Sequence, residues 1–236
     1  MYRHAAFLVR KDGMTHEEFV DYWQNNHTPI AREIEGVVRY TTTVPLDSEA
    51  AEFDGIADLY FEDLEALYDA LGGEGSRDYD PDKGTAKEAR EDVDDFLAIE
   101  RRPRLIGEET VRKDEGDGPY RHTALLVRKD GMTHEEFRDH WLNEHVPIAR
   151  EIPGVVRYTT TVPTDPEHAE FDGIADLYFE DVEALRAALG QEGSRDYDPD
   201  DPKAVEARED VDDFLDLESR PRFIGETTVQ KDITRE

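Results

Sequence analysis

Short apolar runs recur along the first half of the chain, and they predict the strands of a small domain. Residues 3–10 carry a continuous apolar run that is typical of a buried strand. The segments 37–44 and 56–61 are rich in β-branched and aromatic residues, which favour strands. A final strand is expected near residues 104–112. The pattern therefore predicts four strands in the first half of the chain.

The segment after the first strand predicts a helix with Thr15 as its N-cap. Thr15 and Glu18 have the spacing of a capping box, in which each side chain accepts a hydrogen bond from the other residue's backbone N–H. Phe19, Trp23 and His27 follow at intervals of four residues and share one helix face. The helix is therefore expected to present an aromatic face that ends in a histidine.

Pro29 is expected to end this helix. Proline has no N–H and disfavours the helical conformation of the preceding residue, Thr28. We therefore expect the helix to break or kink near His27. A short second helix is predicted over residues 30–34.

Two further helices complete the pattern, over residues 63–71 with Asp63 as the N-cap and over residues 86–97. The intervening segment 72–85 is rich in Gly, Asp and Pro and is expected to be a solvated loop. The element order is β-α-β-β-α-β, the ferredoxin-like arrangement. Such a sheet has helices on one face only, so its other face must be covered by something else.

The whole pattern occurs twice. The segment Tyr2–Asp114 reappears without gaps as Tyr120–Asp232, with 88 of 113 aligned positions identical. A repeat of this length is a domain and not a solenoid unit of roughly 20–50 residues. We therefore predict an α+β fold in which two ferredoxin-like βαββαβ repeats pack sheet to sheet as an intramolecular dimeric α+β barrel. The expected division is a domain at residues 1–112, a linker at 113–119, a second domain at 120–232 and a tail at 233–236.

The formal net charge of −31 narrows the possible partners. Nucleic acids and anionic membranes select basic surfaces, so neither is an expected partner. The acidic residues are spread over both repeats, as in proteins of salt-accumulating halophiles; a merely acidic cytosolic protein is the alternative. The chain has no cysteine, which excludes disulfides and thiol catalysis. No run reaches the ~20 apolar residues of a membrane span, and a cytoplasmic location is expected.

Three motifs resemble one family. They are F-x-x-x-W-x-x-x-H-x-P-I-A at residues 19–31, G-V-V-R-Y at 36–40 and F-D-G-I-A-D-L-Y-F at 53–61, each repeated in the second half. Together they resemble the EthD family of the dimeric α+β barrel superfamily, named for an association with ethyl tert-butyl ether degradation. The resemblance implies relatives described as reductases, oxygenase-related proteins or dehydratases on polyketide-like substrates.

His27 and its repeat His145 are the first catalytic candidates. Each lies where the helix is expected to end, and a helix C-terminus stabilises imidazolium and raises the pKa toward neutrality. A residue with such a pKa is suited to general acid–base catalysis. The alternative is a histidine that only caps the helix.

Asp58 and its repeat Asp176 are the second catalytic candidates. The strand IADLYF has one apolar face, which is expected to pack under the helices, so Asp58 and Tyr60 should point toward the barrel interior. A buried carboxylate with a raised pKa would serve as an acid or base. The alternative is a structural ion pair with Arg39 or His4.

Further residues are expected to contact a substrate or to line its site. They come from the strands and from the aromatic helix face, and in each case packing, backbone hydrogen bonding or ion pairing is the alternative role. The set is His4, Trp23, Arg39, Tyr40, Tyr60, His122, Trp141, Arg157, Tyr158 and Tyr178.

Other histidines and acidic runs are expected to be surface features. His16, His134, His140 and His168 are assigned to the surface, and the runs EDVDDF and RDYDPD are assigned to solvated acidic faces rather than calcium loops. The sequence has no metal, nucleotide or acyl-enzyme motif, so no metal or cofactor is predicted.

These observations favour an EthD-like enzyme with a His/Asp acid–base site in each half, acting on a hydrophobic carbonyl-type substrate by oxidoreductase, isomerase or dehydratase chemistry. One alternative is a non-catalytic, ligand-binding or stress-responsive barrel. Another is a haem-binding barrel, because relatives of the fold ligate haem through a histidine. The expected partners are a small-molecule substrate or ligand and the internal pseudo-dimer, with a further homodimer possible.

Overall fold

The computed structural model describes residues 1–72, 82, 84–190 and 201–234. The chain forms two compact units. The first unit contains Met1–Ser48, Phe53–Glu108 and Thr227–Glu236, and the second unit contains Glu49–Glu52 and Glu109–Glu226. The division in space therefore differs from the division of the sequence repeat, because each unit includes residues from the other repeat.

The first repeat follows the predicted alternation of strands and helices. Its elements are β1 (Tyr2–Leu8), α1 (His16–Tyr22), the π-helical η1 (Trp23–His27), α2 (Thr28–Ala31), β2 (Arg39–Pro45), β3 (Gly55–Phe61), α3 (Leu64–Leu71), α4 (Gly84–Phe96), the 3₁₀ turn η2 (Ile99–Arg101) and β4 (Arg104–Asp114). Most element limits lie within one or two residues of the predicted ones.

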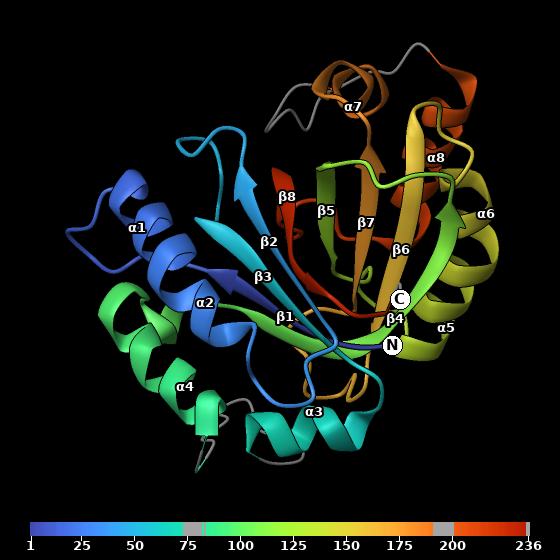
Figure 1. Cartoon of the computed structure of the whole chain (residues 1–236). Helices are drawn as coiled ribbons and strands as arrows, with labels where there is room; N and C mark the ends of the chain where they lie inside the picture. The colour runs from blue at the N-terminus through green and yellow to red at the C-terminus, as the bar shows by residue number, and fades with distance from the viewer. Residues whose placement is uncertain (73–81, 83, 191–200, 235–236) are drawn as a thin grey trace. The chain divides into compact units, whose positions relative to one another are not determined.

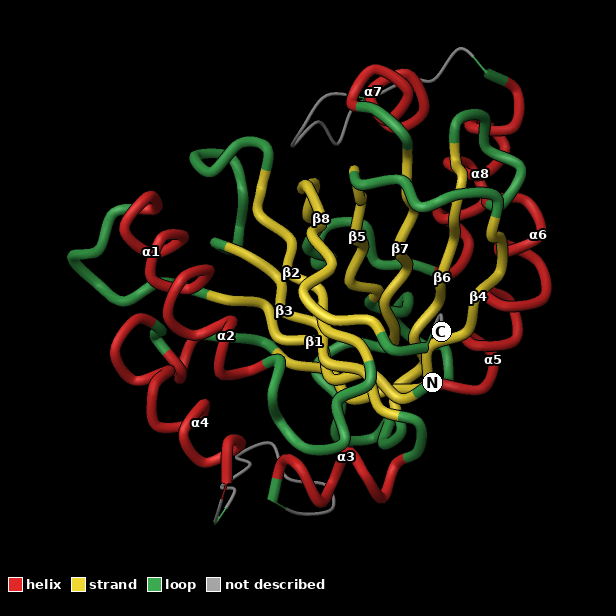
Figure 2. The backbone as a smooth tube through the Cα atoms, viewed as in Figure 1, coloured by secondary structure: helices red, strands yellow, loops and turns green. Residues whose placement is uncertain are grey.

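The sheet of the first unit is antiparallel. Strand β1 pairs with β3, with Ala5 opposite Asp58, and also with the first residues of β4. Strand β2 pairs with the other edge of β3. The C-terminal segment lies beside the residue that precedes β2: the Ile233 N–H donates to the Val38 carbonyl at 3.0 Å. Helices α1, α2 and α4 lie on one side of strands β1 to β3 (Figures 1 and 2).

The second repeat has the same elements in the same order. They are β5 (Tyr120–Leu126), α5 (His134–His140), η3 (Trp141–His145), α6 (Val146–Ala149), β6 (Val155–Pro163), β7 (Gly173–Phe179), α7 (Val182–Leu189), α8 (Pro202–Phe214) and β8 (Arg222–Asp232). In the second unit, β7 pairs with β5 and β6, and β5 pairs with the first residues of β8.

The hydrogen-bonded strand order is β1-β3-β2-β8-β5-β7-β6-β4, and it closes into a barrel. One part of β4 and one part of β8 belong to the first unit, and the rest of each strand belongs to the second unit. Each pair of neighbouring strands is therefore formed by segments that belong to the same unit. An α+β fold with a closed antiparallel barrel is therefore confirmed.

The α-helix is interrupted near His27, as predicted, but the residue before Pro29 stays helical, and the expected loss of helical geometry at Thr28 is wrong. Residues Trp23–His27 form a π turn in which the Thr28 N–H donates to the Trp23 carbonyl, and α2 continues from Thr28. Pro29 lies in the first turn of α2, where its missing N–H is not needed. The short second helix is Thr28–Ala31 and not 30–34. The capping box of Thr15 and Glu18 is confirmed.

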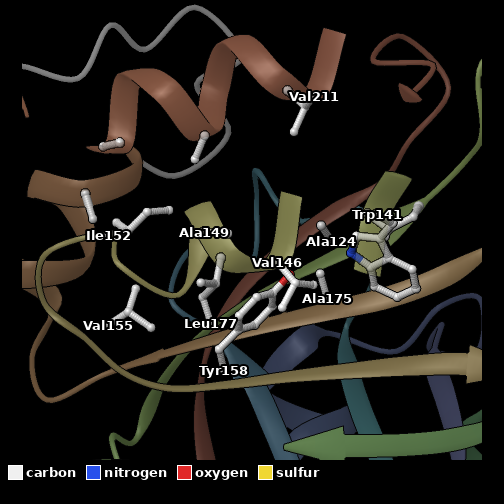
Figure 3. Close-up of a cluster of buried hydrophobic side chains, with 14 of the residues drawn as sticks. Ala124, Trp141, Val146, Ala149, Ile152, Val155, Tyr158, Ala175, Leu177 and Val211 are labelled. Atoms are coloured by element: carbon white, nitrogen blue, oxygen red, sulfur yellow. The ribbon is translucent and has the colours of Figure 1, made fainter. Parts of the chain in front are cut away.

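Each tryptophan packs directly on a glycine of the adjacent sheet. A Cβ atom added at Gly173 would lie 2.5 Å from the Trp141 ring, and Gly55 has the same relation to Trp23. Both tryptophans belong to hydrophobic clusters between helices and sheet. Figure 3 shows the cluster of the second unit, with Trp141 and Tyr158 under the helices. Glycine at these strand positions therefore lets the large indole ring lie against the backbone.

Candidate functional site

Each unit holds a histidine bonded to a partly buried carboxylate. In the first unit, Nδ1 of His27 lies 2.8 Å from Oδ2 of Asp92, and in the second, Nδ1 of His145 lies 2.8 Å from Oδ2 of Asp210. In both pairs the histidine side chain is 12 % exposed and the aspartate side chain 15 %. The histidine comes from the π turn and the aspartate from the long helix that packs beside it. These two pairs are the dyads of the candidate sites.

The hydrogen bond fixes the histidine tautomer. An ionised carboxylate only accepts hydrogen bonds, so Nδ1 is the donor and Nε2 keeps its lone pair in the neutral ring. Burial lowers the pKa of His27 below its ordinary value, Asp92 opposes this, and the nearby Arg102 adds to it. The predicted rise in the pKa of His27 is therefore not found. His27 is a neutral base at pH 7 with a carboxylate ready to stabilise its protonated form.

The second oxygen of each carboxylate has a different partner in the two units. The Tyr22 hydroxyl donates to Oδ1 of Asp92 at 2.9 Å, whereas Nε2 of His140 lies 3.2 Å from Oδ1 of Asp210. His140 stacks on Phe214 with ring centroids 4.8 Å apart. The hydrogen bonds from His145 and His140 lower the pKa of Asp210. His140, which the sequence assigned to the surface, is therefore a partner of the dyad.

Asp92 and Asp210 were missed because they lie in the acidic run EDVDDF, which was assigned to a solvated face. Ala89, Val93 and Phe96 of this helix are buried. Asp92 lies three residues after Ala89 and four before Phe96, so it shares their stripe. The sequence pattern that could have identified these residues is a carboxylate within an apolar helical stripe.

A cavity lies beside each dyad, between the helices and the sheet. The first cavity, in the first unit, has a volume of about 40 Å³, and the second cavity, in the second unit, about 170 Å³. Their walls are mostly apolar and use nearly the same repeat positions. Among the predicted residues, the cavities are lined by His4, Trp23, His27 and Tyr40 in one unit and by His122, Trp141, His145 and Tyr158 in the other.

The strand histidines lie inside these cavities. His4 and His122 are both buried. Burial and the positive charges of nearby arginines lower the pKa of each to about 3; the arginines are Arg104 and Arg102 for His4, and Arg222 and Arg220 for His122. Both imidazoles are therefore neutral at pH 7. Burial also raises the pKa of the Tyr158 hydroxyl, which stays protonated.

Asp58 does not meet His27. Its carboxylate pairs with Arg3, with Nη2 2.7 Å from Oδ1, and both side chains are fully buried. Ala57 and Leu59 line the first cavity, so Asp58 lies on the opposite face of the sheet. The ion pair that was the alternative role for Asp58 is present, with Arg3 as the partner instead of Arg39 or His4.

The remaining predicted residues also lie outside the cavities. Asp176 is fully buried and accepts a 2.6 Å hydrogen bond from Thr123. Tyr60 and Tyr178 are close to the guanidinium groups of Arg3 and Arg121. Arg39 pairs with Asp232 and Arg157 with Asp114. In the described part of the chain, no cluster of three or more His, Asp or Glu residues has the arrangement of a metal site. No helix among the described residues is long and apolar enough to cross a bilayer.

Two solved structures with TM-scores above 0.5 agree with the fold. An anthrone oxidase-like protein is 14% identical, with a TM-score of 0.61 over 97% of this chain and 92% of its own. A proposed monooxygenase from Lactobacillus acidophilus NCFM is 12% identical, with a TM-score of 0.57 over 98% and 97%. An ethyl tert-butyl ether degradation (EthD) family protein from Bacillus halodurans C-125 is 21% identical, with a TM-score of 0.38 over 47% and 99%.

The sequence comparisons identify the repeated unit. A search of curated proteins gave no match. The EthD domain family matches this chain twice, at residues 11–98 and 129–218. Each match includes one dyad and most of the residues that line one cavity. The chain therefore belongs to the EthD domain family, as a tandem duplication within one polypeptide.

Proposed function

We propose that the chain is an acid–base enzyme that acts on a small hydrophobic substrate with a carbonyl group. His27 and His145 would transfer the proton, and Asp92 and Asp210 would orient and stabilise them. The 2.8 Å bond between Nδ1 and the carboxylate, present in both units, is the observation that carries this proposal. Asp58 and Asp176 have no part in it, since their carboxylates lie away from the cavities.

The proposed step begins with a neutral imidazole. Nε2 of His145 removes a proton from the carbon next to the carbonyl, and the resulting imidazolium is stabilised by Asp210. The Tyr158 hydroxyl, on the cavity wall, donates a hydrogen bond to the carbonyl oxygen as negative charge develops there. The proton returns to another carbon in an isomerisation, or assists a leaving hydroxyl in a dehydration.

Two structural neighbours are described as a proposed monooxygenase and an anthrone oxidase-like protein. These descriptions indicate oxidation as the chemistry of those two proteins. Removal of a proton beside a carbonyl is also the first step of cofactor-free oxidation. Proton removal is therefore the step that isomerase, dehydratase and oxidase versions of the proposal share.

A non-catalytic binding barrel is the second candidate, favoured by the burial of Asp58 in an ion pair. The haem-binding alternative fits poorly. The larger cavity, about 170 Å³, is below the roughly 300–1,000 Å³ of pockets for drug-sized ligands.

The finer structural assignments belong to the same proposal. The pairings β4-β1-β3-β2 support a ferredoxin-like repeat, and the sheet-to-sheet packing of the two repeats is proposed with it. The domain limits 1–112 and 120–232, the cytoplasmic location, the halophilic origin and a further homodimer likewise stay predictions.

Proton removal can be tested without knowledge of the final product. One-ring ketones are incubated with the protein in D₂O, and exchange of the hydrogen next to the carbonyl is followed by proton NMR. We expect exchange above the buffer rate and a loss of about 10²–10⁴-fold in the double variant His27→Gln/His145→Gln. The exposed His168→Gln is the matched control. No enzyme-dependent exchange with any ketone would favour the non-catalytic binding barrel.

A further inference from the structure

The second cavity has the volume of a single aromatic ring. A dry apolar cavity of about 150 Å³ in another protein holds benzene, and this cavity measures about 170 Å³. Six small side chains line it, namely Ala124, Ala149, Ala175, Ala188, Ala204 and Ala207. The six equivalent alanines also line the smaller first cavity, so they permit an apolar ring but do not by themselves set the volume. The walls therefore select a compact apolar body.

The second cavity has positively charged side chains at one end, whereas the protein as a whole is acidic. Arg220 and Arg222 line it, together with His122. Arg222 lies opposite Ala124 in the β5–β8 register, and Ala124 is two residues from His122, so all three residues share one sheet face. The exposed Arg208 and Asp212 also line the cavity, and their opposite charges offset each other. The sheet end of the cavity is therefore positive in a chain of net charge −31.

His122 adds a hydrogen-bonding group to this positive end. It is 7% exposed, and its Nδ1 has no hydrogen-bond partner among the described residues. A neutral imidazole has one N–H donor, and a buried polar atom without a partner costs stability that a ligand oxygen would recover. Both arginines also interact with other residues of the chain. Their positive charge nevertheless acts on the His122 side chain, whose pKa it lowers together with burial.

We propose that the second cavity binds a compound of about one aromatic ring that carries a negatively charged oxygen, with this oxygen directed to His122 and the adjacent arginines. The inference rests on the proposed function of the same cavity, for which it names the substrate class. An acidic oxygen at the sheet end would leave the ring between the alanines, within the cavity that His145 also lines. The smaller first cavity is expected to bind the same compound more weakly.

The chain has two tryptophans, and one lines each cavity. The variant Trp23→Phe therefore leaves Trp141 as a fluorescent reporter of the second cavity, and Trp141→Phe leaves Trp23 as a reporter of the first. Benzoate and benzamide are suitable probes, because they have nearly the same shape and only benzoate is charged. Both are titrated at the same salt concentration, since salt screens charge.

We expect benzoate to change the Trp141 emission and to bind at least tenfold more tightly than benzamide. Arg222→Gln should reduce this preference about tenfold, and Arg104→Gln, the matched change in the first unit, should leave it unchanged. Equal binding of the two probes, a preference that survives Arg222→Gln and Arg220→Gln, or no binding of either probe would overturn the proposal.

Two features keep the test decisive. If an arginine variant does not fold, the ratio of benzoate to benzamide affinity in Trp23→Phe still decides. If Trp23→Phe does not fold, ligand-observed NMR on the unchanged protein gives the ratio for both cavities together. Deuterium exchange measures proton removal and uses neither probe. Exchange that persists without benzoate selectivity would therefore reject the ligand class alone, and selectivity without exchange would reject the acid–base function alone.

Discussion

His145 and Asp210 are joined by a 2.8 Å hydrogen bond between Nδ1 and Oδ2, and His27 and Asp92 repeat the same distance. Near-identical sequences would be expected to reproduce a structural contact as readily as a catalytic one. What distinguishes this contact is its place, because each histidine also lines a cavity. The geometry is that of a base whose orientation is set by a carboxylate.

Replacing both aspartates tests this orientation. In Asp92→Asn/Asp210→Asn, the neutral side-chain amide no longer stabilises imidazolium. The amide can also donate or accept a hydrogen bond, so it no longer selects one histidine tautomer. We expect deuterium exchange to fall by about 10²-fold or more, within the range of general acid–base catalysis. Exchange rates and the melting temperature are measured together. An unchanged rate in folded protein would show that the carboxylates are not needed for proton transfer.

The stability of the protein should depend on the two strand histidines. The pKa of each is about 3 in the folded protein, against an ordinary value of 6.5 that we take for the unfolded chain. Well above pH 6.5 neither state is protonated, and this contribution to stability is fully present. As the pH falls from 6.5 toward 3, the unfolded chain binds protons that the folded chain does not, so stability decreases by up to about 1.4 kcal/mol per pH unit for each histidine.

This slope is measured by urea unfolding between pH 6.5 and 5, before most carboxylates titrate. The variant His4→Leu/His122→Leu should have a clearly shallower slope, while both proteins should show none from these residues above pH 7. Equal slopes below pH 6.5 would mean that these histidines become protonated in the folded protein.

Asp58 should prove structural. In Asp58→Asn, the buried Arg3 loses its counter-charge, and breaking such a pair typically costs about 3–5 kcal/mol. We expect a large drop in the free energy of unfolding, with the deuterium exchange rate per folded molecule changed by less than about twofold, because the carboxylate lies outside the cavity. A selective loss of exchange in stable, folded protein would restore Asp58 as a catalytic residue.

The difference between Tyr22 and His140 predicts a difference in titration. In Tyr22→His, the first unit acquires the arrangement of the second, and a protonated imidazole at residue 22 would compete for the charge of Asp92. The pKa of His27 should then fall further, by about one unit, because a nearby like charge disfavours imidazolium. Histidine NMR titration measures this shift, and Tyr22→Phe is the control that removes only the hydroxyl. A rise in the pKa of His27 in Tyr22→His would contradict the competition.

The strands and most helices were predictable because they depend on local patterns. The capping box at Thr15 and the N-cap at Asp63 are examples, and both side chains accept the expected backbone bonds. The continuation of the helix through Pro29 was not predictable, since proline is compatible with the first turn of α2 only after a π turn shifts the register. Trp23, the first residue of that turn, packs against Gly55, a contact between distant parts of the sequence that no local pattern shows.

Half of the dyad was predictable and half was not. His27 was identified from the end of an aromatic helix face. Its partner was predicted to be Asp58 on the basis of strand alternation. Alternation correctly separated the two sheet faces. It does not reveal which residue of a distant helix lies beside His27. Asp92 is 65 residues away in sequence, so only the tertiary packing of α4 joins the two. A carboxylate was predicted to act with His27, and the one that the structure places beside it is Asp92, whereas Asp58 pairs with Arg3.

The division of β4 and β8 between the compact units has a consequence for the history of the gene. Residues Thr227–Glu236 belong to the first unit, where Gln230 donates to Thr42 at 2.9 Å. A half-length ancestor would have carried its own copy of this segment, equivalent to residues 109–118. To form the same strand pairs it would have had to exchange that copy with a second molecule, at a cost that depends on concentration. Fusion makes this exchange independent of dilution. It also allows the copies to diverge separately, and the difference between Tyr22 and His140 at equivalent positions is one such divergence.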